Sequence, residues 1–585
     1  MEYQGTYILI GPPGTGKTRF LADRTAKIVG PQTALRMARM NKGHSPVLIC
    51  SLTRAAAAEI ASRVELPPEA VATIHAHAYR SQGQPPLISN DDIAEWNRLN
   101  PGMALSPIMS RSSQHDDVGP IQATSHGDEF FQHLDRLRNQ MTPQDLWPPA
   151  VRVFARKWTA FKAEKGKIDY TDMLEKADEF PPMSPDVLIV DEAQDTSRLA
   201  FSVLQRWAKH CKAMIVVGDP WQALYTWAGA DPSVLTDDSI EASHKGVLKQ
   251  SYRVPAAIQR YAVQWLESNL TNFKPIEYLP CRENPWDPES DFLEGEVVHL
   301  PHANWRRPAN AVALAEKDIE EGRSVMFVFA CNFQTSPLVT YLRQKGIPFS
   351  NPWRLHNGRW NPLARSKGTN SMDRANALLR PILSDGDPVR WTIRELFLWS
   401  EVCSGIIKYG FKDDIKDQAK KTPDRLLSVE DVMKWFDLDT TWEEIGRVVA
   451  TRDVPTVLNW WLSKSLAKYR KNLEFPTRAL TRQALLSGGS GVGEIAHVRE
   501  QPPLYVGTAH SFKGAEADVV YVFPDLSQAA YQAWRRGRTE EHDAVARAFY
   551  VAFTRARQKL VLCGYASPNA VRFPPCSNVR SPRGF

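Results

Sequence analysis

A glycine-rich segment near the N-terminus carries residue types that bind phosphate. It reads Gly11-Pro12-Pro13-Gly14-Thr15-Gly16-Lys17-Thr18, between the apolar run Tyr7–Ile10 and a helical pattern over Arg19–Ile28. In such a loop the glycines let backbone N–H groups surround phosphate oxygens, and the N-terminal end of the helix adds positive charge. We expect Lys17 to reach the β- and γ-phosphates and the Thr18 hydroxyl to contribute to a Mg²⁺ shell. The segment therefore predicts a nucleoside triphosphate site.

Two adjacent carboxylates supply the other half of such a site. The apolar run Val187–Val190 leads directly into Asp191 and Glu192. We expect Asp191 to hold Mg²⁺ together with Thr18, and Glu192 to orient and deprotonate the attacking water. A solvated turn is the other interpretation of an Asp–Glu pair, but four apolar residues directly before it favour the end of a buried strand. Together the two motifs predict an enzyme that hydrolyses ATP.

Short β-branched apolar runs, followed by amphipathic stretches, occur in two blocks of the chain. The first block contains Tyr7–Ile10, Val47–Cys50, Val187–Val190 and Ala213–Val217, and the second contains Val325–Phe329, Val519–Val522 and Leu560–Cys563. This alternation is typical of parallel-sheet α/β domains. Residues 85–152 and 353–489 lack strand patterning, and the second of these segments is rich in tryptophan. We expect two α/β cores, each with a helical insertion whose tryptophans fill its own core.

Composition narrows the class of protein. A chain of 585 residues exceeds the usual ~100–200 residues of one domain, so several units are expected. No apolar run of about 18 residues and no basic, apolar leader occur, which predicts neither a membrane span nor a secretory signal. The seven cysteines form no C-x-x-C pair, which argues against zinc, an iron–sulfur cluster or a disulfide framework. These features favour a cytoplasmic protein.

The net charge of +6 is weak evidence for any partner, but its distribution is uneven. Residues 531–585 hold ten Arg and Lys against three Asp and Glu. A solvated basic surface is one interpretation of this cluster, and contact with phosphate is the other. The cluster surrounds one of the motifs described next, which favours phosphate contact.

Further motifs accompany the two phosphate-site motifs along the chain. After Ala213–Val217 the chain reads Gly218-Asp219-Pro220-Trp221-Gln222-Ala223-Leu224-Tyr225-Thr226-Trp227-Ala228-Gly229-Ala230. The other segments are Ser51–Glu59, Thr73–His75, Leu248–Arg253, Gly507–Glu516 and Arg547–Arg557. In this order they resemble the UvrD/Rep group of superfamily 1 helicases, over both α/β blocks but neither insertion.

The resemblance implies two RecA-like parallel-sheet P-loop domains, each interrupted by a mainly helical insertion. The expected first RecA-like domain is 1–84 with 153–247, and its insertion is 85–152. The expected second domain is 248–352 with 490–585, and its insertion is 353–489.

The resemblance also implies roles for individual residues at the nucleotide. Gln222 is expected to sense the γ-phosphate, Tyr252 to stack on adenine and Arg19 to lie beside it. Arg253 and Arg555 are expected to act as arginine fingers from the second domain, Glu516 to bind the ribose and Gly514 to belong to the nucleotide site. The phosphates then lie between two domains, so that hydrolysis changes how tightly the cleft is closed.

The expected track is single-stranded DNA. Residues at family positions for the DNA backbone are Thr53, Thr73, His75, Thr508 and His510, and Tyr225 and Trp227 match the base-stacking aromatics. Stacking tolerates any sequence, because every base has a π-face. A core role is the other interpretation of Trp227. The expected partners are therefore single-stranded DNA and its junctions with duplex; the sequence identifies no protein partner.

Three features depart from the family. Lys17 lies too near Met1 for an upstream adenine-recognition glutamine, and Ala228 replaces an arginine that contacts the track. The segment after Leu560–Cys563 also looks too short for the hairpin that splits duplex, although Tyr565 or Phe573 remains as a short pin. A 3′-to-5′ helicase is the leading prediction. A translocase that unwinds poorly, a nucleotide-switched binding module and a motor on RNA are the alternatives.

Overall fold

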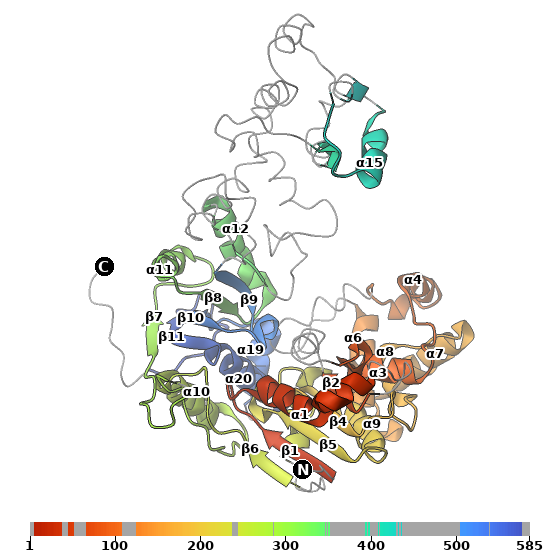
Figure 1. The fold of residues 1–585 in the computed structure, drawn as a ribbon, viewed down its shortest axis with the longest axis horizontal. Helices are drawn as coiled ribbons and strands as arrows, with labels where there is room; N and C mark the ends of the chain where they lie inside the picture. The colour runs from red at the N-terminus through yellow and green to blue at the C-terminus, as the bar shows by residue number, and fades with distance from the viewer. Residues whose placement is uncertain are drawn as a thin grey trace, which may run out of the picture. The chain divides into compact units, whose positions relative to one another are not determined.

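The computed structural model describes residues 5–37, 45–51, 66–107, 125–236, 244–284, 286–345, 347, 349–351, 392–394, 396–397, 408, 410–428, 431, 434–435, 503–537 and 539–575. The chain divides into two compact units (Figure 1). The first comprises 1–304, 328–334 and 507–585, and the second comprises 305–327 and 335–506. Among the described helices, none combines the length and apolar character that crossing a membrane requires.

A six-stranded parallel sheet carries the N-terminal motifs. Its strand order is β3-β2-β4-β5-β1-β6. The strands are β1 (Gly5–Ile10), β2 (Val47–Ser51), β3 (Val71–Thr73), β4 (Val187–Val190), β5 (Ala213–Gly218) and β6 (His244–Val247). Parallel pairing of β1 with β5 and of β5 with β4 places the carboxyl ends of these three strands at one edge. That edge is where open parallel sheets bind ligands.

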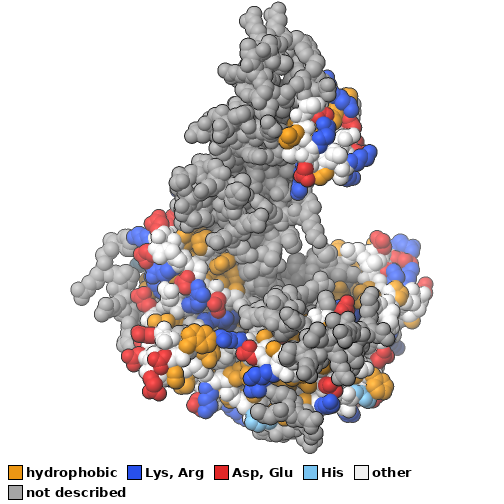
Figure 2. Space-filling view, in the orientation of Figure 1, with side chains coloured by type: hydrophobic (Ala, Val, Ile, Leu, Met, Phe, Trp, Pro, Cys, Tyr) orange, Lys and Arg blue, Asp and Glu red, His pale blue; other side chains and the backbone are white. Residues whose placement is uncertain are grey.

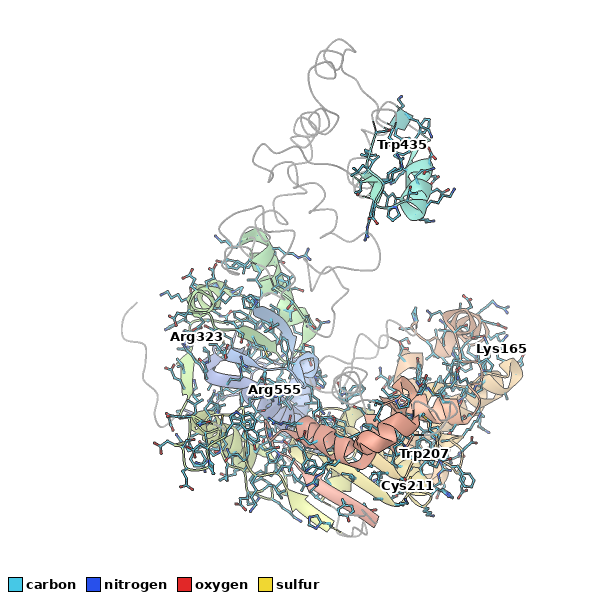
Figure 3. All side chains as sticks on the ribbon, in the orientation of Figure 1. Lys165, Trp207, Cys211, Arg323, Trp435 and Arg555 are labelled. Carbon is cyan, nitrogen blue, oxygen red and sulfur yellow. The ribbon has the colours of Figure 1, made fainter. Side chains whose placement is uncertain are left out.

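Both faces of this sheet are buried. Leu21 and Val29 of α1 (Lys17–Met37) pack on one face, against Ile49 and Ile189. On the other face, α9 (Arg198–Ala208) contributes Leu204 and the fully buried Trp207, which is labelled in Figure 3. Strands covered on both faces read as continuous apolar runs, which is why the sequence identified β1, β2, β4 and β5.

A second sheet has five strands in the order β7-β11-β10-β8-β9. They are β7 (Glu296–Leu300), β8 (Val325–Phe329), β9 (Leu504–Thr508), β10 (Ala517–Val522) and β11 (Ala556–Cys563). Parallel pairing joins β10 to β11 and β11 to β7. The helix α20 (Glu540–Phe553) leads directly into β11, and nearly all its residues are buried. The α/β class with two parallel sheets is thus confirmed.

Helices connect the strands and form the first insertion. The remaining helices are α3 (Ile74–Ser81), α4 (Asn90–Leu99), α6 (His126–Asn139), α7 (Pro149–Lys165), α8 (Tyr170–Glu175), α10 (Ala256–Asn269), α11 (Ala309–Glu320), α12 (Thr335–Lys345), α15 (Lys412–Lys421) and α19 (Gln528–Arg536). The helices α4 and α6 lie within 85–152, where the sequence predicted helices. Trp96 packs edge-on against Phe154 and Trp158 in a core of their own.

A buried ion cluster ties this insertion to the first sheet's connections. Nζ of Lys162 donates to Oδ2 of Asp169 at 2.6 Å and also pairs with Asp172. Arg138 of α6 pairs with the same two carboxylates, with Nη2 2.6 Å from Oδ1 of Asp172. Burial alone would raise the pKa of Asp169, but the charges of Arg138 and Lys162 hold it well below its usual value.

In the second unit, Trp435 is buried and its Nε1 donates to Oδ2 of Asp414 on α15 at 2.9 Å (Figure 3). This contact fits the core role expected for the tryptophans of 353–489. The other tryptophans of that segment lie outside the described residues.

Candidate nucleotide and nucleic-acid sites

The phosphate loop lies at the carboxyl end of β1 and runs into α1. Gly11 N donates to Gly218 O at the end of β5, at 2.8 Å, which fixes the start of the loop on the sheet. Gly14 and Gly16 have φ values of 74° and 75°, a backbone conformation that favours glycine. Nζ of Lys17 donates to Gly11 O at 2.8 Å, so its ammonium group lies inside the loop. The predicted strand, loop and helix are all present.

Asp191 and Glu192 follow β4 at the same edge. Asp191 is 2% exposed, and burial together with the Glu192 carboxylate raises its pKa to about 7. Burial would also raise the pKa of Glu192, but the ammonium groups of Lys513 and Lys17 lower it to about 2. The pKa values of the two neighbouring carboxyl groups are therefore shifted in opposite directions. Glu192 is the one kept ionised, as a general base must be. Glu192 holds a left-handed backbone, with φ of 55°.

Lys513 connects the second motif block to these carboxylates. Its Nζ lies 3.1 Å from Oε2 of Glu192 and pairs closely with Asp195, and its side chain is 6% exposed. Gln194 donates to Oε2 of Glu192 and accepts from Asp219 N at 2.9 Å. The carboxylate of Glu192 is thus oriented from two sides.

Gln222 and Arg555 are in direct contact. Nη2 of Arg555 donates to Oε1 of Gln222 at 2.9 Å, and Nε2 of Gln222 donates to Oδ2 of Asp219 at 2.7 Å. Arg555 is 1% exposed, and burial followed by the charge of Arg253 lowers its pKa to about 9, so it remains a cation at neutral pH (Figure 3). Its Nε donates to Val551 O of α20 at 2.9 Å. The structure therefore brings together two predicted residues that are 333 positions apart.

The segment after β6 touches the loop directly. Oγ of Ser251 and the hydroxyl of Tyr278 both donate to Pro13 O, at 3.0 and 3.1 Å, and Tyr252 N donates to Gly14 O at 2.8 Å. A Cβ added at Gly14 would lie 2.5 Å from Cβ of Arg253, so only glycine fits this approach. Tyr252 and Arg253 are thereby held beside the phosphate loop.

Arg253 and Glu516 form an ion pair. Nε of Arg253 lies 2.5 Å from Oε2 of Glu516, whose Oε1 lies 3.4 Å from Nη1 of Arg557. Burial would raise the pKa of Glu516, but Arg253 and the other arginines lower it. Gly514 has φ of 84°, and a Cβ added there would have no neighbour within 4 Å. The predicted ribose residue Glu516 and the predicted finger Arg253 therefore lie together.

The oxygen ligands proposed for Mg²⁺ fit that ion. Thr18 offers a hydroxyl and Asp191 a carboxylate, and Mg²⁺ prefers oxygen donors. Within the described ranges, no group of three or more His, Cys, Asp and Glu residues is placed to hold a metal. Mg²⁺ needs none, because it keeps several waters and binds through one or two carboxylates and the phosphates of its substrate.

Aromatic side chains gather on the segment between β5 and β6. Tyr225 lies edge-on to Trp227 and to His510, with ring centroids 6.3 and 5.6 Å apart. Nε2 of His510 lies 3.3 Å from Leu224 O. Tyr225 and Trp227 are partly buried, whereas His510 is 2% exposed. The cluster unites three of the residues predicted to contact DNA.

Two of the threonines predicted to contact the DNA backbone are capping or buried residues. Thr73 caps α3 by accepting from Ala76 N at 3.2 Å, and Thr508 is 2% exposed. His75, also on α3, is partly buried, and burial lowers its pKa to about 4, so it is neutral at pH 7. Thr53 lies outside the described residues.

Part of the basic cluster of 531–585 is paired or buried where it is described. Arg547 pairs with Glu540, Arg557 with Glu516 and Asp518, and Arg555 is buried. Basic and acidic side chains are intermixed over the coloured surface of Figure 2. The excess of positive charge therefore does not form a uniform patch on that face.

The sequence did not identify several residues of the site. Lys513 lies inside a quoted motif, but its pairing with Asp195 joins positions 318 apart and leaves no local signal. Ser251 also lay inside a motif, whereas Tyr278 lay in no motif. Their shared acceptor, Pro13 O, could only be found from the fold.

Phe573, one of the two candidate pins, packs against Phe549 and Phe553, with centroids 5.3 and 5.4 Å apart. This packing engages the ring of Phe573 and disfavours it as a pin. Tyr565 is 69% exposed and remains a candidate pin.

Comparisons with known proteins find similarity to DNA helicases. A family model described as an AAA domain matches residues 2–228. The chain is 23% identical to the putative ATP-dependent DNA helicase YjcD of Bacillus subtilis, over 96% of this chain and 77% of that relative. It is 24% identical to the ATP-dependent DNA helicase PcrA of Staphylococcus aureus, over 99% and 83%. A match to a probable DNA helicase II homolog of Mycoplasma pneumoniae, 24% identical, covers 43% of this chain and spans only 38% of that relative.

The two parallel sheets, the ordered motifs and similarity along almost the whole chain lead to one assignment. The chain resembles the UvrD/PcrA-like ATP-dependent DNA helicases in its motifs and along almost its whole length.

Proposed function

We propose that this chain is an ATP-driven translocase on single-stranded DNA that moves 3′ to 5′ and separates duplex at junctions. The polarity is carried over from the family resemblance. Its proposed partners are single-stranded DNA and junctions with duplex, and its proposed location is the cytoplasm.

The observation that carries the proposal is the hydrogen bond between Arg555 and Gln222 at the phosphate edge. Gln222 lies just after β5 of the first sheet. Arg555 lies directly before β11 of the second sheet. A cation supplied from one sheet to a phosphate site on the other makes hydrolysis depend on the arrangement of the two. That dependence is what a motor requires.

Hydrolysis is assigned to the residues at the strand ends. Lys17 binds the β- and γ-phosphates, and Glu192 takes a proton from the attacking water. Mg²⁺, when bound, compensates phosphate charge. Arg555 and Arg253 stabilise the charge that develops on the γ-phosphate, and Gln222 reports its presence to the aromatic segment that follows at Tyr225–Trp227.

The track is assigned to that aromatic segment. Tyr225 and Trp227 lie three and five residues after Gln222, so a change at the γ-phosphate acts on the stacking side chains over a short covalent distance. Base stacking contributes about 1–3 kcal/mol per base and is independent of sequence. Such contacts suit stepping along any DNA strand.

The test is ATP hydrolysis with and without single-stranded DNA, followed by unwinding of duplexes tailed at the 3′ or the 5′ end. Stimulation by DNA and unwinding of 3′-tailed substrates are expected. Hydrolysis that ignores DNA contradicts a motor, and unwinding only from 5′ tails contradicts the polarity. Stimulation by RNA alone would assign an RNA track.

A translocase that unwinds poorly is favoured by one observation. Residues after β11 are fastened to the domain: Ala566 N and Oγ of Ser567 donate to Oδ1 of Asp525 at 3.1 and 2.8 Å, and Asp525 also bridges to Ala570. Together with the packing of Phe573, this leaves Tyr565 as the exposed aromatic in 564–575. Translocation measured beside unwinding decides between the two activities.

A further inference from the structure

An exposed tryptophan lies at the edge of the nucleotide site. The ring of Trp286 is centred 5.8 Å from that of Tyr252, with 31° between their planes, and the guanidinium carbon of Arg19 lies 4.6 Å from the Trp286 ring centre. Tyr252 is 46% exposed and Trp286 is 67% exposed. Two large aromatic rings exposed side by side are unusual unless they contact a ligand or partner.

Both rings are anchored by the same backbone ladder. Ser251 N donates to Leu279 O at 2.9 Å, Leu279 N to Lys249 O at 2.8 Å and Cys281 N to Val254 O at 2.7 Å. The segment that leads to Trp286 therefore runs beside the segment that carries Tyr252. The position of Trp286 relative to Tyr252 is set by this pairing.

The loop that bears Trp286 is closed at its base. Leu293 N donates to Cys281 O at 2.8 Å and Glu283 N donates to Asp291 O at 2.9 Å. Nearer the ring, Trp286 N donates to Oδ1 of Asn284 at 3.2 Å. The backbone is thus held while the indole stays free of neighbours on most of its surface.

The rings lie beside the phosphate loop. A Cβ added at Gly16 would lie 3.8 Å from Cδ2 of Tyr252 and 4.0 Å from Cβ of Arg19. A nucleoside triphosphate whose phosphates occupy this loop therefore directs its base toward the three side chains. The three groups that meet there are a phenol, an indole and a guanidinium, and all three stack on π-faces.

We propose that Trp286 is a nucleotide-binding residue that stacks on the purine of the bound triphosphate, opposite Tyr252. This inference rests on the proposed ATP site. Carbon contacts of about 3.5–4.0 Å on each face of a base require rings roughly 7–8 Å apart. The present 5.8 Å must therefore widen by about 1–2 Å, which the exposure of Trp286 permits.

Stacking on both faces of the base discriminates between bases by ring area. It does not recognise the hydrogen-bonding groups on the edge of the base. The contact of Arg19 with the indole adds a cation to the same site. A purine offers more area to two rings than a pyrimidine does. Trp286 thus supplies a part of base recognition that depends on ring area.

The test compares a probe with a base and one without. In Trp286→Ala, the Kd of ADP measured by calorimetry should rise about 5- to 150-fold, the range for one lost stack. The inhibition constant of inorganic tripolyphosphate, which has no base, should stay the same. Trp286→Phe should recover most of the ADP affinity. Phe180→Ala, at a similarly exposed aromatic that packs on His210, is the matched control and should bind ADP as the unmodified protein does.

An unchanged ADP affinity in Trp286→Ala overturns the proposal. Equal weakening of ADP and tripolyphosphate also overturns it, because it shows a disturbed phosphate loop instead of a lost stack. DNA stimulation of ATP hydrolysis by the unmodified protein is measured in parallel. Its absence counts against the proposed motor, while the comparison of ADP with tripolyphosphate still decides the role of Trp286.

Discussion

Replacing Arg555 by alanine should separate catalysis from stability. Its guanidinium donates to Gln222 Oε1 and to Val551 O, both at 2.9 Å. Two hydrogen bonds from a charged group contribute about 3–6 kcal/mol. Against this, burial and the charge of Arg253 lower the pKa of Arg555 to about 9, so keeping the guanidinium charged in this site opposes folding. The two effects oppose each other.

The free energy of unfolding of Arg555→Ala should therefore stay within about 2 kcal/mol of the unmodified protein. Its kcat for ATP hydrolysis at saturating single-stranded DNA should instead fall about 10³-fold or more, as for other arginine fingers. The KM for ATP should change much less, because Lys17 and the phosphate loop make the ground-state contacts. Arg555→Lys keeps a cation without the planar fork and should recover little.

Steady-state ATPase assays and urea unfolding measure the two quantities on the same preparations. Arg323→Ala is the matched control, because this arginine follows α11, pairs with Asp318 of that helix and lies in none of the motifs (Figure 3). Full DNA-stimulated turnover in Arg555→Ala refutes the assignment of the finger. A large loss of stability that accompanies the loss of turnover refutes the reasoning about compensation.

Four further outcomes are expected. Lys17→Ala should lose nucleotide affinity, whereas Glu192→Gln should bind ATP and DNA but not turn over; near-normal hydrolysis in Glu192→Gln contradicts its role as base. Trp227→Ala should weaken single-strand binding by roughly 1–3 kcal/mol with basal hydrolysis kept, and circular dichroism should show a folded protein unless the residue is a core residue. A·T-rich forks should unwind much faster than G·C-rich forks while translocation rates match, because opening a pair costs on the order of 1–2 kcal/mol and no active wedge assists it; equal fork rates imply a wedge. Since the folded pKa of Asp169 is depressed, its contribution to stability should be present above about pH 4 and lost as the pH falls further, and Asp169→Asn should remove this dependence in urea unfolding.

The sequence predicted those strands that stand out as continuous apolar runs. Buried parallel strands such as Val187–Val190 are apolar on both faces and were read at their observed bounds. The strand β6, His244–Val247, was missed because its edge position leaves its residues half-exposed and its sequence has no apolar run. The strand β3 has only three residues, too few for a period to appear.

At the site, the sequence predicted residue types but not their pairings. Lys17, Asp191 and Glu192 stand next to their strands, so their meeting at one sheet edge followed from parallel topology. The contact of Lys513 with Glu192 depends on how the two motif blocks approach each other, which no spacing encodes. The same is true of Trp286, which lies in no motif and is found only through its distance to Tyr252.

The left-handed backbone of Glu192 sets a limit on engineering this protein. A non-glycine residue with φ of 55° and ψ of 40° costs roughly 1–2 kcal/mol relative to glycine. A screen for thermal tolerance alone would therefore favour glycine at this position. We expect such a variant to unfold at a higher temperature but to hydrolyse no ATP, since it would lack the carboxylate proposed as the base. Robustness and turnover compete at this one residue, and selection for either must be checked against the other.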